Sequence, residues 1–209
     1  MRLRVEDGAV EVVVPRRGNR LDAIRMLEVN ASWILKHTSR QNQDRIEDHS
    51  AVWFQGERWL VRVEPYGKAS VSCSEGQIVV SGPAPSDALQ AWLKDQSSLA
   101  LHGTLERRCQ DMQLAPKRVQ IRDQKSKWGA CTSRGTITLS WRLVMAPMDV
   151  LDYVVVHELA HLREMNHSQR FWNIVSRHCP EFQTHRAWLR RNGSRLVVPD
   201  LNPQEIIES

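Results

Sequence analysis

The stretch HELAH at residues 157–161, followed six residues later by His167, is the part of the sequence from which the rest can be interpreted. Two histidines four positions apart on an α-helix lie only about 40° apart around the helix axis. His157 and His161 can therefore reach one metal ion from the same side of a helix. Glu158 points toward that side too, where a carboxylate can take a proton from metal-activated water without being a ligand.

His167 is the expected third ligand. A catalytic zinc usually has three protein ligands and one open position, and metzincins also place their third histidine ten residues after the first, as His157 and His167 are here. Three histidines suit zinc, with one ion per chain. Glu164 is the competing candidate, but on a continuing helix it would lie roughly 7 Å along the axis from the midpoint of His157 and His161. We expect Glu164 to accept a hydrogen bond from the other ring nitrogen of a ligand.

The motif is predicted to lie on a helix, although residues 152–156 are rich in β-branched side chains that favour a strand. Pro147 suits the first helical position and Asp149 suits the first turn. Apolar side chains recur at helical spacing, as expected of a buried helix: Leu151, Val155, Leu159 and Leu162.

This helix is expected to end near Glu164 or Met165. Asn166, which tolerates the left-handed conformation well, would then turn the chain so that His167 faces the other two histidines. Ser168 is predicted to cap the next helix, which Phe171 and Trp172 would anchor against the core.

Composition indicates an ordinary soluble globular protein. The chain has 209 residues, 41% of them hydrophobic and 25% charged, which is enough for a sizeable core in one domain or two small ones. A net charge of +5 permits contact with nucleic acid without requiring it. The N-terminus lacks an apolar signal core, no run is long enough to cross a membrane, and the four cysteines show no paired spacing. We therefore expect a cytoplasmic protein with reduced thiols and no membrane partner.

The expected fold class is α+β, with a β-rich part at residues 1–83 and a mainly helical part at 84–209. The first part is predicted to hold one helix near 20–37 and three hairpins, over residues 2–14, 51–63 and 68–80. Residues 82–85, Gly-Pro-Ala-Pro, mark the boundary.

In the second part, Ser86 is predicted to cap a long helix that reaches toward Leu114 and that Gly103 can interrupt. Strands are expected at 118–122 and 136–140, with a polar loop between them, and the small sheet they form would lie beside the HELAH helix. A last helix is predicted to open at Pro180 and to stop at Gly193.

Several of these segments resemble the YgjP-like family of zinc metallopeptidases, with SprT-type and WLM-type proteases as more distant kin. The segments that carry the resemblance are residues 122–131, 153–162, 166–168 and 171–172. It implies a zincin-like catalytic part that acts on polypeptides, with His157, His161 and His167 as ligands and Glu158 as base. Two departures are small: Ala130 stands where the family often has Ser, and Ser140 where it often has Asn.

Three further residues have two interpretations each. Arg122 and Lys125 either stabilise the oxyanion or a substrate carboxylate, or are solvated loop charges. Tyr153 either donates to the tetrahedral intermediate or packs beneath the site, and we favour packing. The basic cluster that includes Arg186 is interpreted as a solvated helix face, and His178 and His185 as structural or surface residues.

Two functions follow from these observations. The first is a zinc peptidase in which residues 136–140 offer an edge to an extended peptide. The second is a nucleic-acid-associated, SprT-like module whose metal is structural, or whose proteolysis is restricted to DNA-bound proteins. The basic charge and the SprT-like resemblance motivate the second function, but the sequence contains no DNA-binding motif.

Overall fold

The computed structural model describes residues 2–6, 9–13, 27, 30, 51–64, 66–124 and 126–201. The chain divides into two units, residues 1–49 and 50–209. In the first unit, β1 (Arg2–Glu6) and β2 (Ala9–Val13) pair antiparallel, which confirms the first predicted hairpin. The helix predicted near 20–37 falls outside the described residues except for Leu27 and Asn30.

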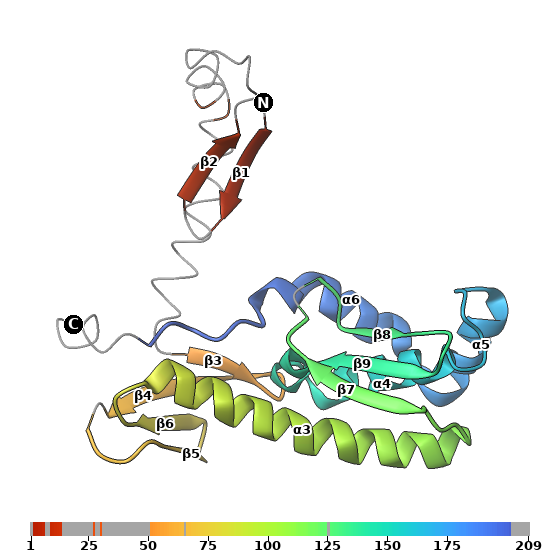
Figure 1. Ribbon diagram of the computed structural model, residues 1–209, viewed down its shortest axis with the longest axis horizontal. Helices are drawn as coiled ribbons and strands as arrows, with labels where there is room; N and C mark the ends of the chain where they lie inside the picture. The colour runs from red at the N-terminus through yellow and green to blue at the C-terminus, as the bar shows by residue number, and fades with distance from the viewer. Residues whose placement is uncertain are drawn as a thin grey trace. The chain divides into compact units, whose positions relative to one another are not determined.

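The second unit begins with a four-stranded sheet of order β3-β4-β6-β5. Both hairpins predicted here are confirmed as antiparallel pairs, β3 with β4 and β5 with β6, and a parallel pairing of β4 with β6 joins them (Figure 1). The strands are β3 (Ala51–Phe54), β4 (Glu57–Glu64), β5 (Ser70–Ser74) and β6 (Gln77–Ser81).

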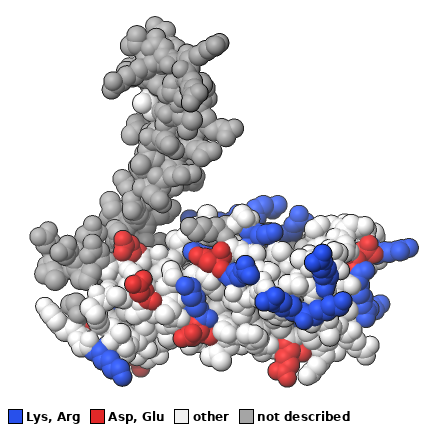
Figure 2. Space-filling view, in the orientation of Figure 1, with Lys and Arg blue, Asp and Glu red and all other residues white. Residues whose placement is uncertain are grey.

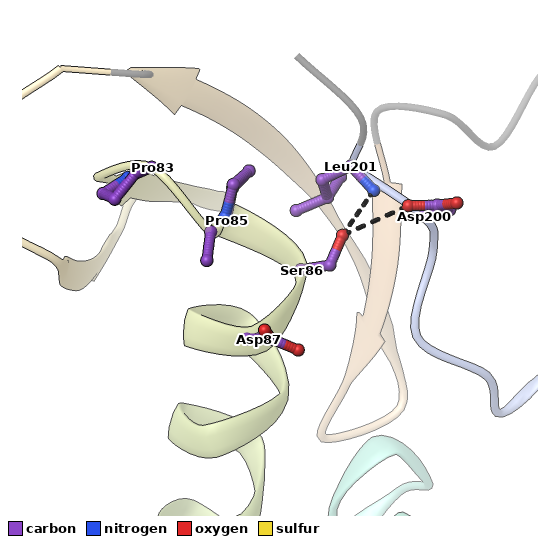
Figure 3. Close-up of a pocket in the computed structure, with 7 residues that line it drawn as sticks. Pro83, Pro85, Ser86, Asp87, Asp200 and Leu201 are labelled. Atoms are coloured by element: carbon purple, nitrogen blue, oxygen red, sulfur yellow. Dashed lines mark hydrogen bonds between the residues drawn. The ribbon is translucent and has the colours of Figure 1, made fainter.

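The long helix α3 (Pro85–Met112) extends from this sheet to the region of α4 (Figure 1) and continues through Gly103. The predicted cap at Ser86 is wrong, because α3 has no side-chain cap and starts with Pro85. Proline suits this position because the first N–H groups of a helix have no partner within the helix, and proline has no N–H. The Ser86 hydroxyl instead donates to Asp200 Oδ1 (3.3 Å) and accepts from the Leu201 N–H (2.8 Å; Figure 3). Ser86 thus ties the segment at 200–201 to the start of α3.

A three-stranded sheet of order β7-β9-β8 follows α3. It consists of β7 (Arg118–Arg122), β8 (Gly129–Cys131) and β9 (Thr136–Ser140), with β7 parallel and β8 antiparallel to β9. The two predicted strands are confirmed, but the predicted loop between them contains β8. Residues 136–140 therefore offer no edge to a peptide, because β7 and β8 occupy both sides of β9. The free edge beside α4 belongs to β8.

Three further helices complete the unit, and the α+β class is confirmed. They are α4 (Met148–Ala160), α5 (Gln169–His178) and α6 (Phe182–Asn192), with short 3₁₀ segments η1 (Trp141–Met145) before α4 and η2 (Gly193–Arg195) after α6. One hydrophobic core runs from Val52 to Leu201. This core includes residues on both sides of the boundary predicted near 83. The division into parts 1–83 and 84–209 therefore stays a prediction. Within the described ranges, no helix is both long and apolar enough to span a membrane.

The turn between β3 and β4 holds the start of α4. The N–H groups of Gln55 and Gly56 donate to the carbonyls of Val144 and Met145, at 2.8 and 3.1 Å. Gly56 has φ +87°, and a Cβ at this position would lie 2.7 Å from Pro147 Cγ. Only glycine fits this close approach to the residue that precedes α4.

Candidate metal centre

Helix α4 places His157 and Glu158 near its C-terminal end and stops at Ala160, with His161 at the C-cap. The predicted end near Glu164 or Met165 is therefore wrong by about one turn. The helix ends early beside a side-chain hydrogen bond: His161 Nδ1–H donates to the Glu164 carbonyl at 3.1 Å. This bond is made within a tight turn, because the N–H of Glu164 donates back to the Ala160 carbonyl at 3.0 Å.

Asn166 turns the chain through its side chain and not through its backbone. Among the described residues other than glycine, positive φ occurs only at Gln55, Glu75 and Gln113, so the left-handed conformation expected at Asn166 is wrong. The Asn166 Oδ1 instead accepts from the Ser168 N–H at 3.1 Å. Ser168 caps α5 as predicted, accepting from the Phe171 N–H at 3.4 Å.

The three histidines converge on one point. One ring nitrogen from each of His157, His161 and His167 lies within 4.8 Å of the other two, and the Nε2 atoms of His157 and His167 are 3.1 Å apart. Zinc–nitrogen distances near 2.0–2.1 Å place tetrahedral ligand nitrogens about 3.3 Å apart. Because His161 uses Nδ1 to donate to Glu164, its Nε2 lone pair is available. The donor set and its spacing therefore fit a zinc ion.

Burial favours the uncharged form of two of these imidazoles, His157 and His161. Desolvation, together with smaller effects of the neighbouring His161, His167 and Arg186, lowers the pKa of His157 to about 3. Desolvation also lowers the pKa of His161. Neutral imidazoles can bind a cation without first losing a proton, so His157 and His161 are ready for metal at neutral pH.

Glu158 lies against β8 and is only 5% exposed. A Cβ at Gly129 would lie 2.5 Å from Glu158 Oε1, so the carboxylate occupies the space that a side chain at position 129 would fill. Glu158 Oε2 is buried without a hydrogen-bond partner among the described residues. This burial raises the pKa of Glu158 to about 7, against an opposing effect of Lys127.

Comparison with known proteins identifies the family. The sequence model described as "YgjP-like, metallopeptidase domain" matches residues 1–192. This chain belongs to the YgjP-like family. As a metallopeptidase domain, it is expected to act on polypeptides with the help of a metal ion.

One solved structure similar to this YgjP-like chain is the metallopeptidase zymogen of Pyrococcus abyssi abylysin. The two share 24% identity over 44% of this chain and 93% of that one, with a TM-score of 0.37. No curated protein matches the chain.

Arg122 and Lys125, the predicted oxyanion or substrate contacts of this YgjP-like chain, are not placed at the histidine cluster by the described structure. In the β7–β9–β8 sheet, Ile121, Leu139 and Gly129 stand in one row across the strands. Arg122, paired with Ser140, is one position further along β7. Because Gly129 contacts Glu158 and side chains alternate along a strand, Arg122 faces away from α4 and is exposed. The structure does not bring Arg122 to the histidines, and Lys125 lies outside the described residues.

Tyr153 and Glu164 lie beside the cluster. The Tyr153 ring is 5% exposed and meets the His157 ring edge-on at 5.9 Å, as packing beneath the site would require. Desolvation raises the pKa of Tyr153. Glu164 accepts a hydrogen bond from the second ring nitrogen of His161, as expected, but through its backbone carbonyl and not through its carboxylate.

Four neighbours of the centre were missed by sequence reasoning: Gly129, Lys127, Trp172 and Arg186. The Trp172 ring stacks on His167 at 5.7 Å and 27°, and the Arg186 guanidinium lies 5.4 Å from the Trp172 centroid. Lys127 also lines a groove of about 590 Å³ together with Trp128. These residues come from β8, its preceding loop, α5 and α6, so spacing along the chain carried no signal that would group them.

Proposed function

We propose that this metallopeptidase is a zinc enzyme that hydrolyses peptide bonds in polypeptides. His157, His161 and His167 would hold one zinc ion, and Glu158 would act as general base. The observation that supports this most directly is the convergence of three imidazole nitrogens within 4.8 Å beside a buried carboxylate. When bound, zinc supplies Lewis acidity that polarises the substrate carbonyl and makes water more acidic.

Glu158 is suited to moving a proton. Its burial places its pKa at about 7, near the pH at which a group can both accept and release a proton readily. We infer that it takes the proton of the attacking water and later delivers it to the leaving amine. Gly129 leaves the space for the carboxylate, and the free edge of β8 can pair with an extended substrate.

The decisive test compares the wild type with Glu158→Gln, both freed of metal and reloaded with zinc. Cleavage of unfolded casein should fall by roughly 10²–10⁴ in the variant, because an amide cannot accept the proton. Zinc content should stay at one per chain in both proteins. Loss of zinc in the variant would make Glu158 a ligand, and an inert wild type would reject the peptidase proposal.

A second candidate is a peptidase recruited to nucleic acid, and one surface favours it. The three strands β7, β8 and β9 contain no Asp or Glu, and the outer face of β7 carries Arg118 and Arg122, both exposed. Figure 2 shows Lys and Arg gathered over the region where β7 and β9 lie in Figure 1. Duplex DNA should bind with an affinity that falls steeply with salt, and Arg118→Gln with Arg122→Gln should flatten that slope. Equal binding by the double variant would reject this candidate.

A further inference from the structure

Helix α6 brings a cation, Arg186, close to the histidine cluster. Its guanidinium lies 5.4 Å from the centroid of the Trp172 ring. The Trp172 ring, which belongs to α5, stacks on the His167 ring with the centroids 5.7 Å apart. The centroid of the same ring lies 5.9 Å from that of His157. The guanidinium is therefore held by a cation–π contact to the same indole that packs on two of the three histidines.

Arg186 makes no ion pair with any acid in the described part of the chain, and its side chain is exposed. Four other arginines of the same unit do bind carboxylates: Arg62, Arg107, Arg108 and Arg142. A cation close to a metal site is repelled by the metal unless an anion lies between them. No carboxylate of the described residues forms an ion pair with Arg186, so a substrate is the natural source of that anion.

Glu158 and Arg186 approach the site from different elements. Glu158 lies against Gly129 of β8. Arg186 belongs to α6, and its guanidinium lies over the Trp172 ring of α5. The proton acceptor and the α6 cation are therefore separate, and both can act on one substrate without neutralising each other.

We propose that Arg186 is a catalytic residue that donates hydrogen bonds to the scissile carbonyl oxygen as that oxygen becomes negatively charged. This inference rests on the proposed peptidase function. In the step concerned, the water oxygen bonds to the carbonyl carbon, the water proton passes to Glu158, and the π electron pair moves onto the carbonyl oxygen. Arg186 stays protonated throughout and stabilises the new charge.

Kinetics on casein test this role, with Arg186→Ala, Arg186→Lys and the matched control Arg190→Ala, which removes an exposed arginine one turn further along α6. We expect Arg186→Ala to lower kcat by roughly 10²–10³ with little change in KM. Arg186→Lys should recover part of this loss, because it keeps the charge but not the planar fork. Arg190→Ala should behave as wild type.

Binding gives a readout that does not depend on turnover. The probe is N-phosphoryl-Leu-Phe, whose tetrahedral phosphoryl oxygens imitate the charged carbonyl oxygen, titrated calorimetrically into the zinc-loaded proteins. Its affinity should fall at least about 10-fold in Arg186→Ala relative to Arg190→Ala. Zinc content and the melting temperature should stay unchanged in both variants.

Three results would overturn the inference: equal kcat in Arg186→Ala and Arg190→Ala, a change confined to KM, or loss of zinc from Arg186→Ala. A change confined to KM would assign Arg186 to binding a substrate carboxylate, and loss of zinc would assign it to holding Trp172 in place. Failure of the peptidase proposal looks different, because the wild type itself would then cleave nothing.

Discussion

Neighbouring residues His157 and Glu158 respond in opposite directions to the same burial. Desolvation lowers the pKa of the imidazole to about 3 and raises the pKa of the carboxyl group to about 7. In the metal-free protein, both side chains are therefore largely neutral in slightly acidic solution. Their shifts predict opposite effects of pH on the stability of that form.

Glu158→Gln should stabilise the metal-free protein at high pH. Because the folded pKa of about 7 exceeds the ordinary value of 4.5, the folded state binds more protons between these values, and the stability contributed by neutral Glu158 is lost as pH rises through 7. Gln does not titrate, so its advantage over the wild type should grow by on the order of 3 kcal/mol between pH 4.5 and 8.

Urea unfolding of both proteins in a metal chelator, at several pH values, measures this difference. His157 titrates in both proteins, so its contribution cancels. A stability difference that does not change with pH would show that Glu158 is not desolvated in solution.

Gly129→Ala should lower activity while zinc stays bound. The added Cβ would lie 2.5 Å from Glu158 Oε1 and must displace the carboxylate, whereas none of the three histidines needs to move. We expect a loss of at least about 10-fold in kcat/KM, since small displacements of catalytic groups have large effects. Gly103→Ala is the control, because a Cβ there meets nothing within 4 Å; it should stabilise α3 by about 1 kcal/mol. Normal activity in Gly129→Ala would contradict the proposed role of Glu158.

At the scale of elements, periodicity predicted most of the secondary structure of the described residues. The hairpins, β7, β9 and α5 follow from alternation, turns or a capping residue, and α4 forms despite its β-branched run because it is buried. The end of α4 could not be predicted, since it depends on a hydrogen bond from the His161 side chain to a carbonyl in the following turn. Strand β8, Gly-Ala-Cys, has no strand-forming composition and exists because it pairs with β9.

In the site too, some residues could be predicted from the sequence and others could not. Spacing alone placed His157, Glu158 and His161 at one end of α4 and related His167 to them. Lys127, Gly129, Trp172 and Arg186 lie on other elements, and only the packing of β8, α5 and α6 around α4 brings them near the cluster. Predicting them would have required the tertiary arrangement of those elements.

The turn between α4 and α5 can be tested through Asn166. His167→Ala should reduce zinc affinity by orders of magnitude, and His185→Ala should not.

Asn166→Val should weaken zinc binding about 10-fold, because it removes the acceptor for the Ser168 N–H and loosens the turn that carries His167. Asn166→Asp keeps that acceptor and should bind zinc nearly as tightly as the wild type. Competition with a chromogenic chelator measures all four affinities, and equal values for the Val and Asp variants would contradict this role.

At the scale of the whole unit from 50 to 209, a chain of charges links three helices. Asp152 of α4 accepts from Arg108 of α3 at both carboxylate oxygens (2.8 and 2.6 Å), and Arg108 also binds Asp111. Asp111 in turn contacts His178 of α5 at 3.0 Å. His178, expected to be structural or a surface residue, thus belongs to the packing of α5 on α3.

Asp152→Ala should destabilise the protein by about 2–4 kcal/mol, because Arg108, only 18% exposed, would lose its main partner. Glu64→Ala is the control. It breaks the Arg62–Glu64 pair, whose side chains are 64% and 49% exposed, and should change stability by less than about 0.5 kcal/mol. Chemical denaturation measures both values, and similar effects of the two substitutions would show that the α3–α4 link contributes little.

The hydrogen bonds from the β3–β4 turn to Val144 and Met145 limit how helix α4 can be transplanted. Val144 and Met145 are fully buried, and their carbonyls accept from Gln55 and Gly56, some ninety residues earlier in the chain. A graft that carried α4 and α5 to a new scaffold without residues 51–64 would leave two buried acceptors empty, each destabilising by about 1–3 kcal/mol. The smallest portable form of this centre therefore includes a hairpin that contributes no side chain to the histidine cluster.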